Sequence, residues 1–189
     1  LYTVDSIDRE SWLDQGKSAS QRGMRHNDYD RYIIHEFVPF LRDHSGWNGG
    51  ILTTGCSMGG FHALNFMLRH PDVFDGTVAL SGIYDGRFFV GEQLHEPAVY
   101  ENSPVDYLMH LNDANHLDLL RRCAIIVCTG QGAWEADSIR DTQKVEDVFK
   151  RQDIPAWIDY WGTDVDHDWP WWRVQMPYFL GQLEQQGLL

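Results

Sequence analysis

The chain has 189 residues, of which 43% are hydrophobic and 23% charged, a composition typical of a globular domain and unlike that of disordered or collagen-like chains. A folded chain of this length buries roughly 70% of the surface that its unfolded form exposes, so we expect one domain over residues 1–189 with a core of its own. The formal net charge of −13 repels phosphate backbones and anionic lipids, which argues against nucleic-acid and membrane-surface partners.

Short apolar runs alternate with longer amphipathic stretches, which is the pattern of βαβ units around a parallel sheet. The first run, residues 1–4, predicts a strand. Asn27 or Asp28 then predicts the N-cap of a helix, because apolar residues follow at helical spacing from position 29 to 40. This helix should end before Gly46.

The later elements follow the same rhythm. Strands are predicted over residues 51–54, 77–80, 124–128 and 156–161, and helices over 61–69, over 138–151 and near Pro170. Residues 83–116 interrupt it with two prolines and many polar groups, which predicts a lid-like insertion that covers one end of the sheet. The expected fold class is α/β, a three-layer sandwich around a mostly parallel central sheet.

Residues 55–60 read GCSMGG and match the G-x-S-x-G pattern of a nucleophile elbow. A predicted strand precedes the motif and a predicted helix follows it, as such an elbow requires. Ser57 would then be the nucleophile, and the backbone N–H of Met58 the first donor of an oxyanion hole at the positive end of the helix. The alternative is a glycine-rich turn in which Ser57 only caps the helix.

A serine nucleophile needs a histidine base, and nine histidines compete for this role. Functional groups of a parallel α/β sheet collect at the carboxyl ends of the strands. His167 stands a few residues after the last predicted strand, whereas the other histidines lack such a position. We therefore expect His167 to be the base.

The acid that orients the base should follow the strand over residues 124–128, which leaves three candidates, Glu135, Asp137 and Asp141. Asp137 could cap the next helix, and Asp141 lies a turn inside that helix. Glu135 stands in a glycine-containing loop that can fold back toward His167. Glu135 is therefore favoured over Asp137, with a solvated surface acid as the alternative.

Neither a metal nor a cofactor is indicated by the sequence. The acidic residues around His167 lack the rest of a calcium-loop pattern, and no histidine pair has a zinc-ligand spacing. The three cysteines, without a CxxC pair, are interpreted as free thiols: Cys56, Cys123 and Cys128. With no apolar run long enough to span a membrane, we expect a protein of the cytoplasm.

Four segments together resemble the putative-esterase family of α/β-hydrolases: GCSMGG at 55–60, LSGIYD at 80–85, NSPVDY at 102–107 and HDWPWW at 167–172. That family includes S-formylglutathione hydrolases of the esterase D type, feruloyl and enterochelin esterases and mycolyltransferases, and the chain is most similar to bacterial members known only as esterases. The resemblance implies a serine hydrolase with Ser57 as nucleophile and His167 as base. It places Glu135 in the loop of the acid, where many relatives have aspartate.

The resemblance also implies that N-terminal strands are lacking, because relatives have several strands before the one predicted at residues 1–4. The loop after an early strand normally supplies the second oxyanion donor. We expect the uncovered sheet edge at residues 1–4 to favour a homo-oligomer or a partner segment that completes the sheet.

The function that we predict is cleavage of a small-molecule carboxylic ester by a Ser-His-acid triad through an acyl-enzyme intermediate, without a cofactor. Two alternatives are an acyltransferase that uses the same triad and a catalytically inactive hydrolase fold that serves as a binding module.

Overall fold

The computed structural model describes residues 1–188 and divides the chain into two compact units. The first, here called the helical unit, comprises Leu1–Gly49 and Gly86–Ser103. The second, the sheet unit, comprises Gly50–Asp85 and the chain from Pro104 onward. The residues of the predicted lid, 83–116, are shared between the two units, so the lid and the single-domain organisation stay predictions.

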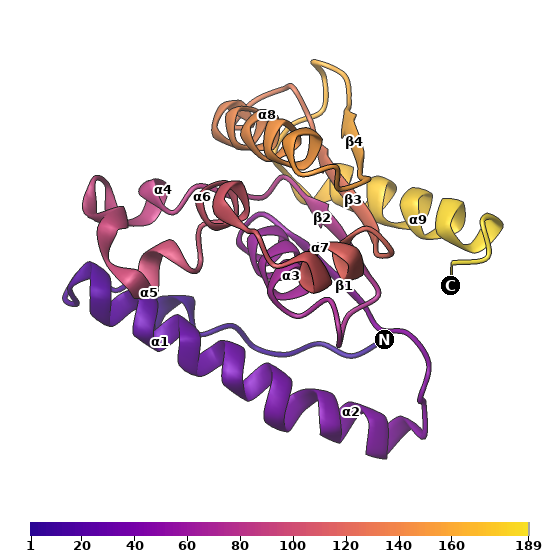
Figure 1. Ribbon diagram of the computed structural model, residues 1–189. Helices are drawn as coiled ribbons and strands as arrows, with labels where there is room; N and C mark the ends of the chain where they lie inside the picture. Colours follow the sequence, from indigo (N-terminus) through magenta and orange to yellow (C-terminus); the bar gives the residue numbers. More distant parts are fainter. Residues whose placement is uncertain (189) are drawn as a thin grey trace. The chain divides into compact units, whose positions relative to one another are not determined.

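The sheet unit is built on four parallel strands (Figure 1), which are β1 (Leu52–Cys56), β2 (Gly76–Leu80), β3 (Ala124–Thr129) and β4 (Trp157–Tyr160). Their order in the sheet is β1-β2-β3-β4, and the pairing places Cys56 beside Leu80 and Leu80 beside Cys128. The predictions of an α/β fold and of a parallel sheet are therefore confirmed. The four predicted strands agree with the observed ones to within two residues at each end. The largest difference is at the end of β1, which includes residues 55 and 56 of the predicted elbow.

Three long helices flank this sheet: α3 (Met58–Arg69), α8 (Ala136–Arg151) and α9 (Trp169–Gln185). The helices α3 and α8 lie on one face. There the hydroxyl of Thr53 in β1 donates to the carbonyl of Ala63 in α3 at 2.9 Å, and the hydroxyl of Tyr160 in β4 donates to Glu146 in α8 at 2.9 Å.

The opposite face of the sheet packs against α9, so the unit has three layers (Figure 1). Alternate strand residues point to this face, as the two-residue period of a strand requires. A buried core cluster joins sheet and helix through Val78, Leu80, Ile126, Cys128, Trp172, Phe179 and Leu183. Shorter helical segments of the unit are α6 (Pro104–Tyr107), a 3-10 turn (Leu108–His110) and α7 (Ala114–Leu120).

The helical unit consists of α1 (Ala19–Tyr32), a π-helical turn (Ile33–Phe37), α2 (Val38–Ser45), α4 (Arg87–Val90), α5 (Pro97–Tyr100) and 3-10 turns at Asp8–Glu10 and Gln93–His95. The rings of Trp12 and Phe89 stack in its interior with centroids 5.2 Å apart. Arg22 in α1 donates to the backbone carbonyls of both residues.

Two predictions for the first 45 residues are wrong. Residues 1–4 form no strand, because this segment lacks a hydrogen-bonded strand neighbour; instead the hydroxyl of Tyr2 bonds Nδ1 of His44 at 2.8 Å. The sheet edge expected there therefore does not exist. The first helix begins at Ala19, because Ser18 and Gln21 form a reciprocal capping box that outcompetes the cap expected at Asn27 or Asp28.

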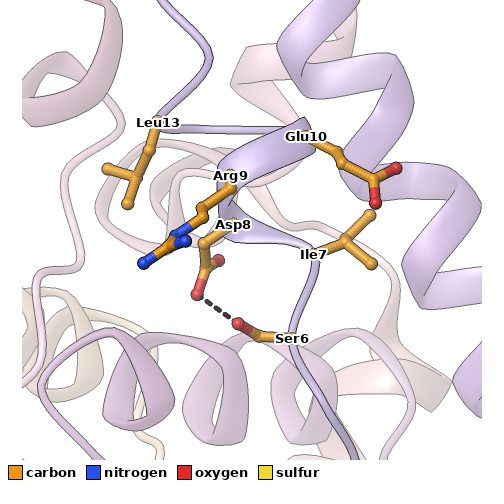
Figure 2. A pocket seen from close by; sticks show the side chains of 6 residues that line it. All are labelled: Ser6, Ile7, Asp8, Arg9, Glu10 and Leu13. Atoms are coloured by element: carbon orange, nitrogen blue, oxygen red, sulfur yellow. Dashed lines mark hydrogen bonds between the residues drawn. The ribbon is translucent and has the colours of Figure 1, made fainter.

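A hollow of about 390 Å³ lies in the helical unit and is lined by one continuous segment (Figure 2). Its lining residues are Ser6, Ile7, Asp8, Arg9, Glu10 and Leu13. The hydroxyl of Ser6 donates to the carboxylate of Asp8 at 2.6 Å across one side of it (Figure 2). None of the predicted site residues lines this hollow.

Candidate active site

Each of the four strands is followed by a polar residue of the candidate site. Ser57 comes directly after β1, Ser81 directly after β2, Glu135 in the loop after β3 and His167 in the loop after β4. Because the strands are parallel, their carboxyl ends meet at one edge of the sheet. All four residues belong to the sheet unit.

Ser57 stands in a sharp bend between β1 and α3. Its backbone has φ 55° and ψ −122°, a conformation that is rare for a residue other than glycine and that stores strain of about 1–3 kcal/mol. Two hydrogen bonds hold the bend: the N–H of Ser57 donates to the carbonyl of Leu80 at 2.9 Å, and its own carbonyl accepts from Phe61 N–H at 3.1 Å. The side chain of Ser57 makes no capping hydrogen bond to the helix.

The glycines of the motif differ in whether a larger residue would fit in their place. A Cβ at Gly55 would lie 2.2 Å from the carbonyl oxygen of Gly59, and one at Gly60 would lie 2.7 Å from that of Leu80. A Cβ at Gly59 would meet nothing within 4 Å. The tight approach of α3 to the strands therefore requires glycine at positions 55 and 60 only.

We expect Gly55→Ala to lower the free energy of unfolding by about 1–3 kcal/mol, because the added methyl group must displace backbone. The matched control Gly59→Ala should be neutral or stabilising by up to about 1 kcal/mol, since alanine favours a helix over glycine. Urea denaturation of both variants measures the difference. Equal stability of the two variants would contradict this view of the bend.

The ring of His167 lies between the other two predicted side chains. Its Nε2 is 2.9 Å from Oγ of Ser57, and its Nδ1 is 3.2 Å from Oε2 of Glu135. A carboxylate only accepts, so Nδ1 is the nitrogen that donates to Glu135, and in this tautomer Nε2 is the acceptor for the hydroxyl of Ser57. The structure thus brings together the three side chains that the sequence singled out.

Backbone hydrogen bonds join the loops after β3 and β4 and explain how Glu135 reaches His167. The N–H of Gly132 donates to the carbonyl of Val165 at 2.9 Å, and the N–H of His167 donates to the carbonyl of Ala133 at 2.9 Å. The carboxylate of Asp166 accepts from Ala133 N–H at 2.6 Å. Asp166 therefore fastens the loops to each other.

Glu135 is fully buried, and its carboxylate is surrounded by donors. The hydroxyl of Ser81 donates to Oε1 at 2.6 Å, that of Thr129 to Oε2 at 3.1 Å, and the N–H of Gly130 to Oε1 at 3.3 Å. Burial alone raises the pKa of Glu135, but the hydrogen bonds from His167, Ser81 and Thr129 outweigh it and leave that pKa below its ordinary value. The carboxylate is therefore ionised at neutral pH.

The two rejected acids have other contacts. Asp137 is half-exposed and pairs with Arg140 at 2.6 Å. Asp141 is buried and accepts the backbone N–H groups of Tyr84 and Asp85 at 2.9 and 3.0 Å, which anchors the loop after β2. Neither contact involves the histidine ring.

Met58 is the first residue of α3, so its N–H has no acceptor within that helix. It directly follows Ser57 at the positive end of the helix dipole. Its role as an oxyanion donor stays a prediction, supported by this position.

Ser81, Thr129 and Trp172 also contact the site, although they were not among the predicted site residues. Ser81 accepts a hydrogen bond from Nε1 of Trp172 at 3.1 Å and donates to Glu135. Its position in the sequence could have indicated Ser81 as a site residue, because Ser81 follows β2 as directly as Ser57 follows β1.

Residues 1–188 contain no group of three or more His, Cys, Asp or Glu side chains that could hold a metal ion. In the same part of the chain, no helix combines the length and apolar character needed to cross a membrane. The three cysteines are free thiols, and burial raises the pKa of Cys56 to about 11.

Several solved structures share the fold of this chain. A ferulic acid esterase has 24% identity and a TM-score of 0.64 over 80% of this chain and 59% of its own. An S-formylglutathione hydrolase from Agrobacterium tumefaciens has 16% identity and a TM-score of 0.63 over 80% and 55%. A fluorophosphonate-binding serine hydrolase from Staphylococcus aureus has 19% identity and a TM-score of 0.57 over 79% and 62%. The fold is therefore that of the α/β-hydrolases, and the chain spans about three fifths of the length of these proteins.

Among curated proteins the comparison found no significant match. A family model described as "Putative esterase" matches residues 3–183, which is nearly the whole chain. The chain therefore belongs to the putative esterase family.

Proposed function

We propose that the chain carries the active site of a serine hydrolase that cleaves carboxylic esters, with Ser57 as nucleophile, His167 as base and Glu135 as the acid that orients the base. The observation that supports this is the hydrogen-bonded series Ser57–His167–Glu135, with 2.9 Å at the first contact and 3.2 Å at the second. These distances are within the reach that nucleophile activation requires.

In the first half of the reaction, Oγ of Ser57 attacks the carbonyl carbon of the ester while its proton moves to Nε2 of His167. The buried carboxylate of Glu135 accepts a hydrogen bond from Nδ1–H, remains ionised, and stabilises the imidazolium that forms. The N–H of Met58 donates to the oxyanion. His167 then gives its proton to the leaving alkoxide, so an alcohol departs and the acyl group remains on Ser57.

In the second half, water attacks the acyl carbon and gives a proton to His167. The bond between this carbon and Oγ of Ser57 breaks, the proton returns to Ser57, and a carboxylic acid leaves. Each proton is taken up and released by the same ring nitrogen, so the cycle needs no cofactor.

The substrate that we propose is a small-molecule ester, in agreement with the family. A cytoplasmic location also stays a prediction, and the three free cysteines support it, because reducing compartments keep thiols unpaired.

Labelling with a fluorophosphonate probe tests the proposal, because such probes form a covalent bond with an activated serine. We expect one label per chain in the unaltered protein and none in Ser57→Ala. Ser45→Ala, which alters an exposed serine of α2, is the matched control and should be labelled fully. Labelling that persists in Ser57→Ala, or an unaltered protein that takes no label, would overturn the assignment.

A further inference from the structure

Ser81 is a fully buried residue in an unusual backbone conformation at the end of β2. Its exposed fraction is 0% and its φ is 51°, so it resembles Ser57 in being a non-glycine residue with positive φ after a strand. Two hydrogen bonds fix its backbone: its N–H donates to the carbonyl of Cys128 at 2.7 Å, and its carbonyl accepts from the hydroxyl of Ser138 at 3.1 Å. Such maintained strain often marks a functional position.

The direction of the Ser81 hydroxyl proton follows from its two partners. The indole Nε1 of Trp172, 3.1 Å away, can only donate, so Oγ of Ser81 must accept from it. The single proton of Ser81 is then left for Oε1 of Glu135, at 2.6 Å. The indole thus takes an acceptor position of the Ser81 hydroxyl and leaves its proton for the carboxylate, which can only accept.

The other hydroxyl at this carboxylate is less constrained. Thr129 has one proton and two acceptors at the same distance of 3.1 Å, Oε2 of Glu135 and the carbonyl of Gly130. Of these two hydroxyl contacts to Glu135, the one from Ser81 is shorter and fixed in direction. It holds Oε1, which leaves Oε2 directed at His167.

Trp172 contacts the base as well as Ser81. Its ring meets the ring of His167 edge to face, with centroids 5.0 Å apart and an interplanar angle of 85°. The indole is buried in the core between the sheet and α9. The base and the hydroxyl that donates to the acid thus both contact the same buried side chain.

We propose that Ser81 is a positioning residue of the reaction, which holds the carboxylate of Glu135 in the orientation that binds and stabilises the ring of His167. This inference rests on the proposed function, because it assigns Ser81 an effect on catalysis through Glu135. Ser81 itself touches neither the nucleophile nor the reacting atoms.

Two variants remove the hydroxyl in different ways. We expect Ser81→Ala and Ser81→Gly to lower kcat for a p-nitrophenyl ester roughly tenfold to a hundredfold, the range of a hydrogen bond to a charged group, with KM little changed. Ser81→Gly tests the same loss without backbone strain, since glycine adopts positive φ freely.

Thr77→Val is the matched control. Thr77 lies in β2 and is fully buried, and its hydroxyl has no partner among residues 1–188, so the exchange removes a buried hydroxyl from the same strand without touching the carboxylate. We expect kcat of Thr77→Val to stay within about twofold of that of the unaltered protein. If this control loses activity as Ser81→Gly does, the effect is one of packing and the inference is wrong.

A double-mutant cycle with Glu135→Gln separates positioning from a general structural effect. The readout is the rate constant of fluorophosphonate labelling, which stays measurable in slow variants. If Ser81 acts through the carboxylate, Ser81→Gly should change this rate less than about threefold in the Glu135→Gln background. An equal factor in both backgrounds would overturn the inference and leave the proposed function intact, whereas labelling that persists in Ser57→Ala overturns the proposed function itself.

Discussion

His167→Ala should lower kcat for hydrolysis of a p-nitrophenyl ester by about 10⁶-fold, the size of the loss when the base of a serine-protease triad is removed. Without the ring, no group within reach takes the proton of Ser57, and the carboxylate of Glu135 has no imidazolium to stabilise. Steady-state hydrolysis at pH 7–8, corrected for spontaneous hydrolysis, measures the loss. The double variant Ser57→Ala/His167→Ala should be no slower than the slower single variant, because the residues act as one unit.

Rescue by a small base distinguishes a chemical from a structural loss. The side chain of His167 is 21% exposed, so the space that the ring leaves is open to imidazole from solution. We expect millimolar imidazole to restore part of the activity of His167→Ala and to leave Ser57→Ala inactive. His110→Ala, which alters an exposed histidine of the sheet unit, is the control and should keep full activity. Retention of more than a tenth of the activity in His167→Ala would contradict its role.

The sequence identified the two central strands, β2 and β3, most directly, because they are buried on both faces. Such strands appear as continuous apolar runs, as at residues 124–128, and the turn residues that follow them mark where the chain leaves the sheet. Chain order in a parallel sheet then places Ser57 and His167 at the same edge. This reasoning needs only local pattern and parallel topology, and both are confirmed.

The structure of the first 45 residues was predicted less well, because strand-like composition and two possible helix caps favour different structures there. Residues 1–4 have strand-like composition, but a strand exists only where a neighbour supplies hydrogen bonds, and no local pattern reports this. The cap of α1 was present in the sequence as Ser18 followed three residues later by Gln21. Asn27 and Asp28 offered a competing cap, but the reciprocal hydrogen bonds of Ser18 and Gln21 start the helix earlier.

The choice between Glu135 and Asp137 depends on loop conformation. Trp134 has φ 66°, so the chain turns sharply just before Glu135, and Glu135 is buried while Asp137 is half-exposed. Spacing alone does not predict such a turn at a tryptophan. The contact between Ser81 and Glu135 could not be predicted from the sequence either, because the two residues, and the indole of Trp172 that also bonds Ser81, lie far apart along the chain.

Glu135→Gln should lower kcat by roughly 10³–10⁴-fold, because the exchange keeps the size of the side chain but removes the charge that stabilises protonated His167. The amide has one oxygen in place of two, while Ser81 and His167 both need an acceptor. The variant therefore cannot satisfy both donors with good geometry. Steady-state hydrolysis gives kcat, and Asp137→Asn is the control, which should keep its activity because Asp137 pairs with Arg140 on the surface.

Glu135→Gln also tests the charge of the acid, through the way the free energy of unfolding changes with pH. The pKa of Glu135 lies below its ordinary value of about 4.3. Its carboxylate therefore stabilises the fold above that value, and this contribution is lost as the pH falls toward the lower pKa of the folded state. In urea denaturation from pH 7 to pH 3, we expect the stability advantage of the unaltered protein over Glu135→Gln to shrink below about pH 5.

Asp141 should change the stability with pH in the opposite direction to Glu135, because burial raises the pKa of Asp141 above its ordinary value. Its contribution to the free energy of unfolding is fully present at low pH and is lost as the pH rises through the raised pKa of the folded state. The stability of the unaltered protein relative to Asp141→Asn should therefore increase as the pH falls, the reverse of the trend for Glu135→Gln. A stability advantage over Glu135→Gln that grows as the pH falls would show that the hydrogen bonds from His167, Ser81 and Thr129 do not outweigh the burial of Glu135. A neutral acid at this position could not stabilise the protonated base.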